Sequence, residues 1–76
     1  MTLDELRPGD RGIIENVNGE GALRRRLLEM GLTPGTAVYS QKTAPFGDPI
    51  EIRVRGYQLT LRKDEAAKID IRKAEA

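Results

Sequence analysis

The chain has 76 residues, with 13 lysines and arginines against 12 aspartates and glutamates, and it contains neither cysteine nor histidine. A chain of this length forms one domain with a small core, and the missing residue types exclude thiolate metal sites, thiol nucleophiles and histidine bases. The net charge of +1 argues against a dedicated nucleic-acid binder, which normally carries a larger basic excess.

The N-terminus predicts a short helical turn. Thr2 and Glu5 have the spacing of a capping box, and Leu3 and Leu6 lie on one side of the turn. The basic start and apolar run of a secretion signal are missing, and no window has the roughly 18 apolar residues of a membrane span. We therefore expect a cytoplasmic protein without direct membrane insertion, whose N-terminal turn covers one end of a sheet.

Residues 11–17 predict the first strand because they are rich in β-branched side chains. Their alternation is imperfect, since Ile13 and Val17 fall on the same face as Glu15 unless a bulge intervenes. The register of this strand therefore stays open at the level of the sequence.

Residues 22–30 predict a short helix. Leu23, Leu27 and Met30 recur at helical spacing and form an apolar stripe. Gly31 then supplies the left-handed residue with which many helices end. About nine residues are too few for a helix to be stable alone in water, so we expect this one to dock on the sheet.

Two Pro-Gly pairs precede predicted strands. Pro8-Gly9 leads into the first strand, and Pro34-Gly35 leads into a second strand over residues 37–42. Proline and glycine suit the two central positions of a type II turn. The sequence therefore predicts the same turn at both places.

Residues 50–62 show the clearest pattern in the chain, a strict alternation of apolar and polar side chains. This alternation predicts a hairpin, and we expect Gly56 and Tyr57 to be the central residues of a type II′ turn. The resulting register pairs apolar residues with apolar ones and sets Glu51 opposite Arg62 as an ion pair across the strands.

The end of the chain predicts a helical turn capped by Asp64, a last strand over residues 68–72 and a loose tail over residues 73–76. Together these elements indicate a mainly β fold in a single domain of residues 1–76. We expect a small, partly open barrel of about five strands, with one short α-helix inserted after the first strand.

Several blocks of the sequence resemble the FeoA family. They are Gly21 to Leu32 (GALRRRLLEMGL), Pro34-Gly35, Ala44 to Pro49 (APFGDP) and Arg55 to Leu59 (RGYQL), and they occur in the order that the family shows. The resemblance implies an SH3-like barrel, a role in bacterial ferrous iron uptake, and binding to the cytoplasmic part of the membrane transporter FeoB. It also implies a relationship to the C-terminal SH3-like domain of DtxR-type metal-dependent repressors.

Arg24 and Arg25 are candidate partner-binding residues on the predicted helix. They suit an acidic partner or a layer of lipid headgroups, and the alternative is a solvated helix face with no binding role. Tyr57, in the tight turn of the hairpin, is a third candidate, as a wall of a binding groove or simply as a polar tip.

Phe46 is the fourth candidate and the only phenylalanine of the chain. It lies in a loop that Pro45 and Pro49 stiffen, and a rigid loop with an exposed aromatic side chain is an effective anchor because it loses little entropy on binding. The alternative is that the ring folds back and closes one end of the barrel.

From these features we expect a non-catalytic accessory protein that binds an FeoB-like transporter and modulates it. The alternative is a nucleic-acid or repressor-associated binding module that uses basic residues on the hairpin, although few aromatic side chains are present for stacking. The residues predict no metal site and no cofactor. The scattered carboxylates leave a divalent transition metal as an alternative ligand.

Overall fold

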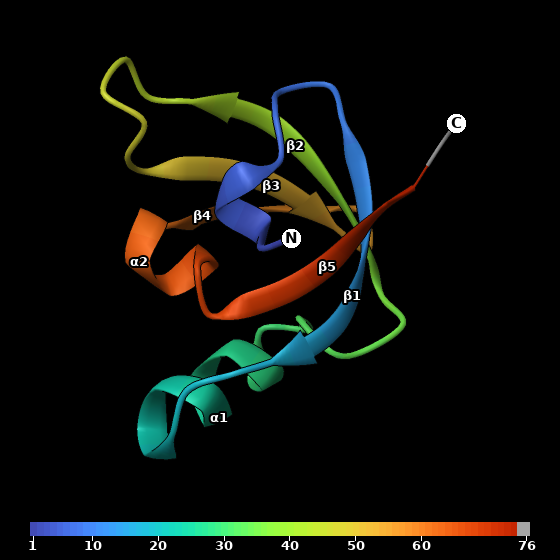
Figure 1. Ribbon diagram of the computed structural model, residues 1–76, viewed down its shortest axis with the longest axis vertical. Coiled ribbons are helices and arrows are strands. Elements are labelled where there is room, and N and C mark those ends of the chain that lie inside the picture. The colour runs from blue at the N-terminus through green and yellow to red at the C-terminus, as the bar shows by residue number, and fades with distance from the viewer. Residues whose placement is uncertain (75–76) are drawn as a thin grey trace.

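In the part of the chain that the structure describes, the fold is built around one antiparallel sheet of five strands in the order β4-β3-β2-β1-β5. The computed structural model describes residues 1–74. The strands are β1 (Arg11–Val17), β2 (Ala37–Thr43), β3 (Ile50–Val54), β4 (Tyr57–Leu61) and β5 (Ile69–Ala74). The sheet curls on itself (Figure 1), and within residues 1–74 its outer strands, β4 and β5, are not paired with each other. The predicted partly open barrel of five strands is confirmed.

Over residues 1–74, three short helices accompany the sheet: η1 (Leu3–Glu5), α1 (Gly21–Glu29) and α2 (Lys63–Ala66). The α1 helix is inserted between β1 and β2, as predicted, and lies at one end of the barrel in Figure 1. The α2 helix links β4 to β5, and η1 packs against both α2 and β5. Together η1 and α2 cover the side on which the sheet is open.

The core receives apolar side chains from every strand and every helix. Its buried members are Leu3, Leu6, Ile14, Val17, Leu27, Leu32, Val38, Ile50, Ile52, Val54, Leu61, Ala66, Ile69 and Ile71. Full burial of one such aliphatic side chain contributes about 1.5–3 kcal/mol. The N-terminal turn is part of this core, because Leu3 is completely buried and Leu6 nearly so. The N-terminal turn is therefore a plug packed into the core, in contact with α2 and β5.

The α1 helix ends in a Schellman motif at Gly31, whose φ is 92°. The amide of Leu32 donates to the carbonyl of Leu27 over 3.2 Å, and the amide of Gly31 donates to the carbonyl of Leu28 over 3.0 Å. Leu27 and Leu32 are both fully buried. The predicted helix stop therefore also anchors α1 to the core.

Both Pro-Gly turns form, and each glycine is bonded to the opposite strand. The amide of Gly9 donates to the carbonyl of Ser40 in β2 over 2.8 Å, and the amide of Gly35 donates to the carbonyl of Ile14 in β1 over 2.7 Å. Both glycines have φ near 90° (92° and 88°), which a type II turn requires at this position. The two turns thus extend the pairing of β1 and β2 at both ends.

A bulge settles the register of β1. The pairing of β1 with β5 shifts between Ile14 and Asn16, so Glu15 has no partner residue. The extra residue places Ile14 and Val17 in the core and leaves Glu15 exposed. This is the bulge that the imperfect alternation of the sequence left open.

The hairpin of β3 and β4 forms, but its turn lies one residue earlier than predicted. Val54 pairs with Tyr57, so the two central residues are Arg55 and Gly56. Their φ angles are 49° and 83°, and two left-handed residues in succession define a type I′ turn rather than the predicted type II′ turn.

This shift changes every cross-strand partner by two positions. Glu51 faces Thr60 and not Arg62, so the predicted ion pair across the strands is wrong. The physical reason is that a shift of two positions preserves the alternation, and apolar residues still meet on the inner face. The pattern alone therefore does not distinguish the two registers.

Two predictions for the end of the chain are also wrong. The α2 helix begins at Lys63, with Arg62 and not Asp64 in the capping position. The last strand continues to Ala74, because Lys73 and Ala74 pair with β1, so these two residues are not a loose tail. Residues 75–76 of the predicted tail lie outside the described residues.

Candidate partner-binding surface

The structure distributes the four predicted partner-binding residues over three elements. Arg24 and Arg25 lie on α1, Phe46 lies in the loop between β2 and β3, and Tyr57 begins β4. Their surroundings differ enough to separate the residues that are free to bind from those that hold the fold together.

Phe46 is the most exposed large apolar side chain among the described residues, with 98% of its surface accessible. Its loop is closed by two backbone hydrogen bonds. The amide of Ala44 donates to the carbonyl of Pro49 over 3.1 Å, and the amide of Gly47 donates to the carbonyl of Ala44 over 2.7 Å. Of the two interpretations left open by the sequence, the folded-back ring is therefore wrong, and the exposed aromatic on a braced loop is what forms.

A shallow pocket of about 400 Å³ lies beside this loop. Its lining residues are Lys42, Thr43, Ala44, Pro45, Pro49, Glu51 and Thr60. The two prolines and Ala44 give it an apolar wall, and the ion pair of Lys42 with Glu51, at 3.8 Å, lies at its edge. The loop that exposes Phe46 thus also borders an apolar recess, and protein partners bind such surfaces through a few buried side chains.

The two arginines of α1 have different roles. The Nε of Arg24 donates to the carbonyl of Val17 over 3.1 Å, so this side chain ties α1 to the end of β1. The side chain of Arg25 is exposed and makes no hydrogen bond or ion pair with residues 1–74. Both arginines are exposed, and Arg25 is the one whose side chain is not engaged in holding α1.

Tyr57 connects the hairpin to α1. Its hydroxyl donates a hydrogen bond to the carbonyl of Met30, which is the C-cap residue of α1. This bond satisfies one of the carbonyls that the end of a helix leaves without an internal partner. The ring keeps 42% of its surface exposed, so Tyr57 is at once a structural link and part of the surface next to α1.

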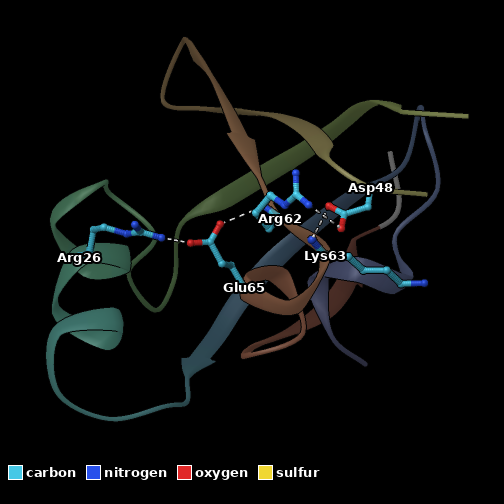
Figure 2. A network of polar contacts seen from close by, with 5 residues as sticks. All are labelled: Arg26, Asp48, Arg62, Lys63 and Glu65. Carbon is cyan, nitrogen blue, oxygen red and sulfur yellow. Dashed lines mark hydrogen bonds and ion pairs between the residues drawn. The ribbon is translucent and has the colours of Figure 1, made fainter. Parts of the chain in front are cut away.

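A polar network joins the Phe46 loop to α1 through α2 (Figure 2). Asp48 accepts a hydrogen bond from the amide of Lys63 over 2.9 Å, and its other oxygen lies 3.6 Å from the Nη2 of Arg62. Glu65 accepts from the amide of Arg62 over 2.9 Å and forms an ion pair with Arg26. The loop that carries Phe46 is thereby fixed to the first turn of α2, and α2 is fixed to α1.

Sequence reasoning missed this network because its members are far apart in the chain. Asp48 precedes Lys63 by 15 positions, and no local periodicity links the two. The spacing of Arg62 and Glu65 does carry a signal, since the acidic side chain three residues after the cap position reaches back to the cap amide. Reading that signal places the start of α2 correctly.

Within residues 1–74, no three acidic, histidine or cysteine side chains gather as a group that is able to hold a metal ion. Over the same residues, no helix is long and apolar enough to cross a membrane.

Among known proteins, the chain is similar to proteins named for Fe(2+) transport. It is 41% identical over 71 residues to the Fe(2+) transport protein A/Fe(2+) transporter FeoB fusion protein of Porphyromonas gingivalis. That match covers 93% of this chain and 8% of the fusion protein, so the chain corresponds to a small part of that relative.

Solved structures agree with the fold. The FeoA of Stenotrophomonas maltophilia, described as a prokaryotic SH3 domain protein and solved with zinc, is 30% identical, with a TM-score of 0.85. That match covers 95% of this chain and 89% of the other. A manganese-dependent transcriptional repressor, 16% identical, has a TM-score of 0.87 over 96% of this chain and 40% of its own, and this likeness concerns the fold alone.

The SH3-like fold predicted from the sequence is thus confirmed, together with its likeness to a domain of metal-dependent repressors. A family model for the FeoA domain matches residues 1–73. The chain therefore belongs to the FeoA family, which its relatives link to ferrous iron transport.

Proposed function

We propose that this chain is a non-catalytic, cytoplasmic accessory protein of bacterial ferrous iron uptake, and that it binds the cytoplasmic part of an FeoB-like transporter and modulates it. The observation that carries the proposal is the ring of Phe46, 98% exposed on a braced loop beside an apolar recess. Exposing such a side chain to water is unfavourable, and a partner that covers it recovers this free energy.

The fusion protein of Porphyromonas gingivalis supports the choice of partner. In that relative, one polypeptide contains both transport protein A and the transporter FeoB. Linking two modules in one chain raises their effective concentration to about the millimolar range, so a weak contact between them is occupied most of the time. A single aromatic anchor with a charged neighbour is a contact of this weak class.

Phe46 is the proposed anchor, and Arg25 is the proposed charged contact. A phenylalanine ring buries about 150–250 Å² on binding, and such rings are common among the residues that dominate binding energy. Asp48 holds the loop against α2 through Lys63 and Arg62. Because the loop is already ordered, it loses little conformational entropy when the ring is covered.

Calorimetric titration with the purified cytoplasmic region of the transporter from the same organism tests the proposal. We expect Phe46→Ala to weaken binding by about 2 kcal/mol or more, the usual size for a dominant contact. The matched control is Lys68→Ala, which truncates an exposed side chain on another part of the surface. Unchanged binding by the Phe46 variant, or no binding by the wild type, contradicts the proposal.

Charge reversal tests the second contact. Arg25→Glu is expected to weaken binding and to reduce its dependence on salt, whereas Arg7→Glu makes the same change at another exposed arginine and serves as the control. The proposal includes no resident metal ion, so a chelator in the titration is expected to leave the affinity unchanged. Equal effects of the two reversals would remove Arg25 from the contact surface.

A further inference from the structure

The outer face of the sheet carries a row of one tyrosine between two arginines. In the strand register, Tyr39 of β2 faces Arg53 of β3 on one side and Arg11 of β1 on the other. The ring of Tyr39 is 45% exposed, and the Cζ of Arg11 lies 5.9 Å from its centroid, within the range of a cation–π contact. The row belongs to three strands, whereas Phe46 lies in a loop and Arg25 in α1.

A shallow groove of about 500 Å³ runs beside the row. It is lined by Pro34, Gly35, Thr36, Ala37, Tyr39, Arg55 and Gly56. Its walls combine apolar carbon with hydrogen-bond donors, because the Nη2 of Arg55 lies 3.3 Å from the Oγ1 of Thr36. The Nη2 of Arg53 reaches the carbonyl of Gly56 over 3.4 Å. Arg55 thus lies in the wall of the groove, and Arg53 and Arg11 flank Tyr39 on the two neighbouring strands.

None of these three arginines has a carboxylate partner among residues 1–74. The ion pairs of the described chain are Arg26–Glu65, Lys42–Glu51, Arg62–Asp48, Arg72–Glu15 and Lys73–Asp10. Several other basic side chains of the described chain are neutralised by carboxylates, whereas the positive charges of these three arginines are not. Clustered like charges repel one another and attract anions to the surface between them.

Arg55 occupies this place at a conformational cost. Its φ of 49° is left-handed, and the first central position of a type I′ turn favours asparagine, aspartate or glycine. Strained residues of this kind concentrate at functional sites, where the function of the side chain requires the unfavourable backbone conformation. The side chain that results is a guanidinium in the wall of the groove.

We propose that the groove binds an acidic peptide segment, with Arg11, Arg53 and Arg55 holding its carboxylates. Clusters of arginine recognise acidic motifs in this way, and guanidinium–carboxylate bonds are among the stronger hydrogen bonds in proteins. A nucleic acid fits less well. Arg11 already lies over the Tyr39 ring, and no second aromatic side chain lines the groove, so bases find no stacking platform.

The probe for the test is a fluorescein-labelled octaglutamate peptide, with octaglutamine as its uncharged counterpart and oligothymidylate as the nucleic-acid arm. Amide NMR shifts report the site, and fluorescence anisotropy reports the affinity. We expect octaglutamate to shift the amides of Thr36, Tyr39 and Gly56 and to bind more weakly as salt is added. Octaglutamine is expected to cause neither effect.

Two variants make the assignment specific. Arg53→Gln and Arg55→Asn are each expected to weaken octaglutamate binding about tenfold, the usual size for a lost charged hydrogen bond. Because asparagine suits the turn better than arginine, Arg55→Asn is expected to keep or raise the urea midpoint, so its loss of binding is not a loss of fold. Phe46→Ala is the control and leaves this binding unchanged.

The proposal is overturned by any of three results. The first is the absence of shifts at the groove, and the second is octaglutamate binding that survives in both arginine variants. The third is tighter binding of oligothymidylate at the same amides, which would assign the groove to nucleic acid. None of these results depends on whether Phe46 contacts a transporter.

Discussion

The two ends of β3 present opposite kinds of surface. The loop before Ile50 exposes the apolar ring of Phe46, and polar contacts from Asp48 brace it. The turn after Val54 exposes the charged side chain of Arg55 on a strained backbone. The strand between them sends its alternate side chains into the core. A short strand therefore secures the core while its two connections present chemically different surfaces, one apolar and one charged.

The largest effect on stability is expected in the middle of β3, the strand that connects the two ends. Ile52 is fully buried in the middle of β3, and Ile52→Ala should destabilise the protein by about 2–5 kcal/mol through lost burial and a residual cavity. Urea unfolding measures this change, with Ile52→Val as the milder control at about 0.5–1.5 kcal/mol. If Ile52→Ala lost less stability than Ile52→Val, the burial of Ile52 in β3 would not be what holds the two ends together.

The brace at the Phe46 end is expected to have an intermediate effect. Asp48→Ala removes the acceptor of the Lys63 amide and the ion partner of Arg62, and comparable losses at helix starts cost about 0.5–2 kcal/mol. Hydrogen exchange at the Lys63 amide should quicken, whereas the amides of the Arg55 turn should not change. Equal quickening at both places would mean that the two ends are coupled.

At the Arg55 turn, we expect a substitution to raise the stability of the protein. Arg55→Asn replaces a strained residue by one that accepts the left-handed conformation, and we expect a gain in stability of up to about 1 kcal/mol. Arg55→Ala is the matched control, because it removes the charge but keeps the strain. A urea midpoint raised equally by both variants would show that charge repulsion, and not backbone strain, is what the substitution relieves.

The smallest effect is expected at Glu5, which belongs to neither end. The hydrogen bond from the Thr2 amide holds the pKa of Glu5 below its ordinary value of 4.5. A carboxyl group with a lowered pKa stabilises the fold above its unfolded pKa, and this contribution is lost as pH falls through the folded value. Acid titration followed by NMR should therefore give a lower pKa for Glu5 than in a short peptide, and Thr2→Pro, which removes the amide donor, should return it toward that value.

The sequence predicts those parts of the fold that local periodicity determines. The apolar stripe around Leu27 predicted a helix, and the alternation around Ile52 predicted a strand. In both elements the residues predicted to face the core do so. The position of the hairpin turn was missed because two registers satisfy the same alternation, and only the left-handed backbone of Arg55 separates them. The outward direction of Phe46 was left open for a similar reason, since neighbouring residues do not specify it.

The parts of the surface that depend on contacts between distant residues were not predictable from one sequence. Asp48 meets Lys63 only because the end of β4 returns beside the loop. The row around Tyr39 exists only once the register across β1, β2 and β3 is known. The exposure of single residues such as Arg25 was predicted correctly. The groups of surface residues, in contrast, become visible only when the strands are assembled into the sheet.

The hydrogen bonds at the two ends of the α1 segment have a consequence for motion. Before the helix, the amide of Asn18 donates to the carbonyl of Lys68 over 2.6 Å, and after it the amide of Gly35 donates to the carbonyl of Ile14 over 2.7 Å. The segment that contains α1 is therefore hydrogen-bonded at one end to the turn before β5 and at the other end to β1. Between these two bonds α1 is held by the buried Leu27 and by its contacts with Glu65 and Tyr57. We therefore expect a ligand that binds α1 to act on the strands of the barrel as well as on the helix.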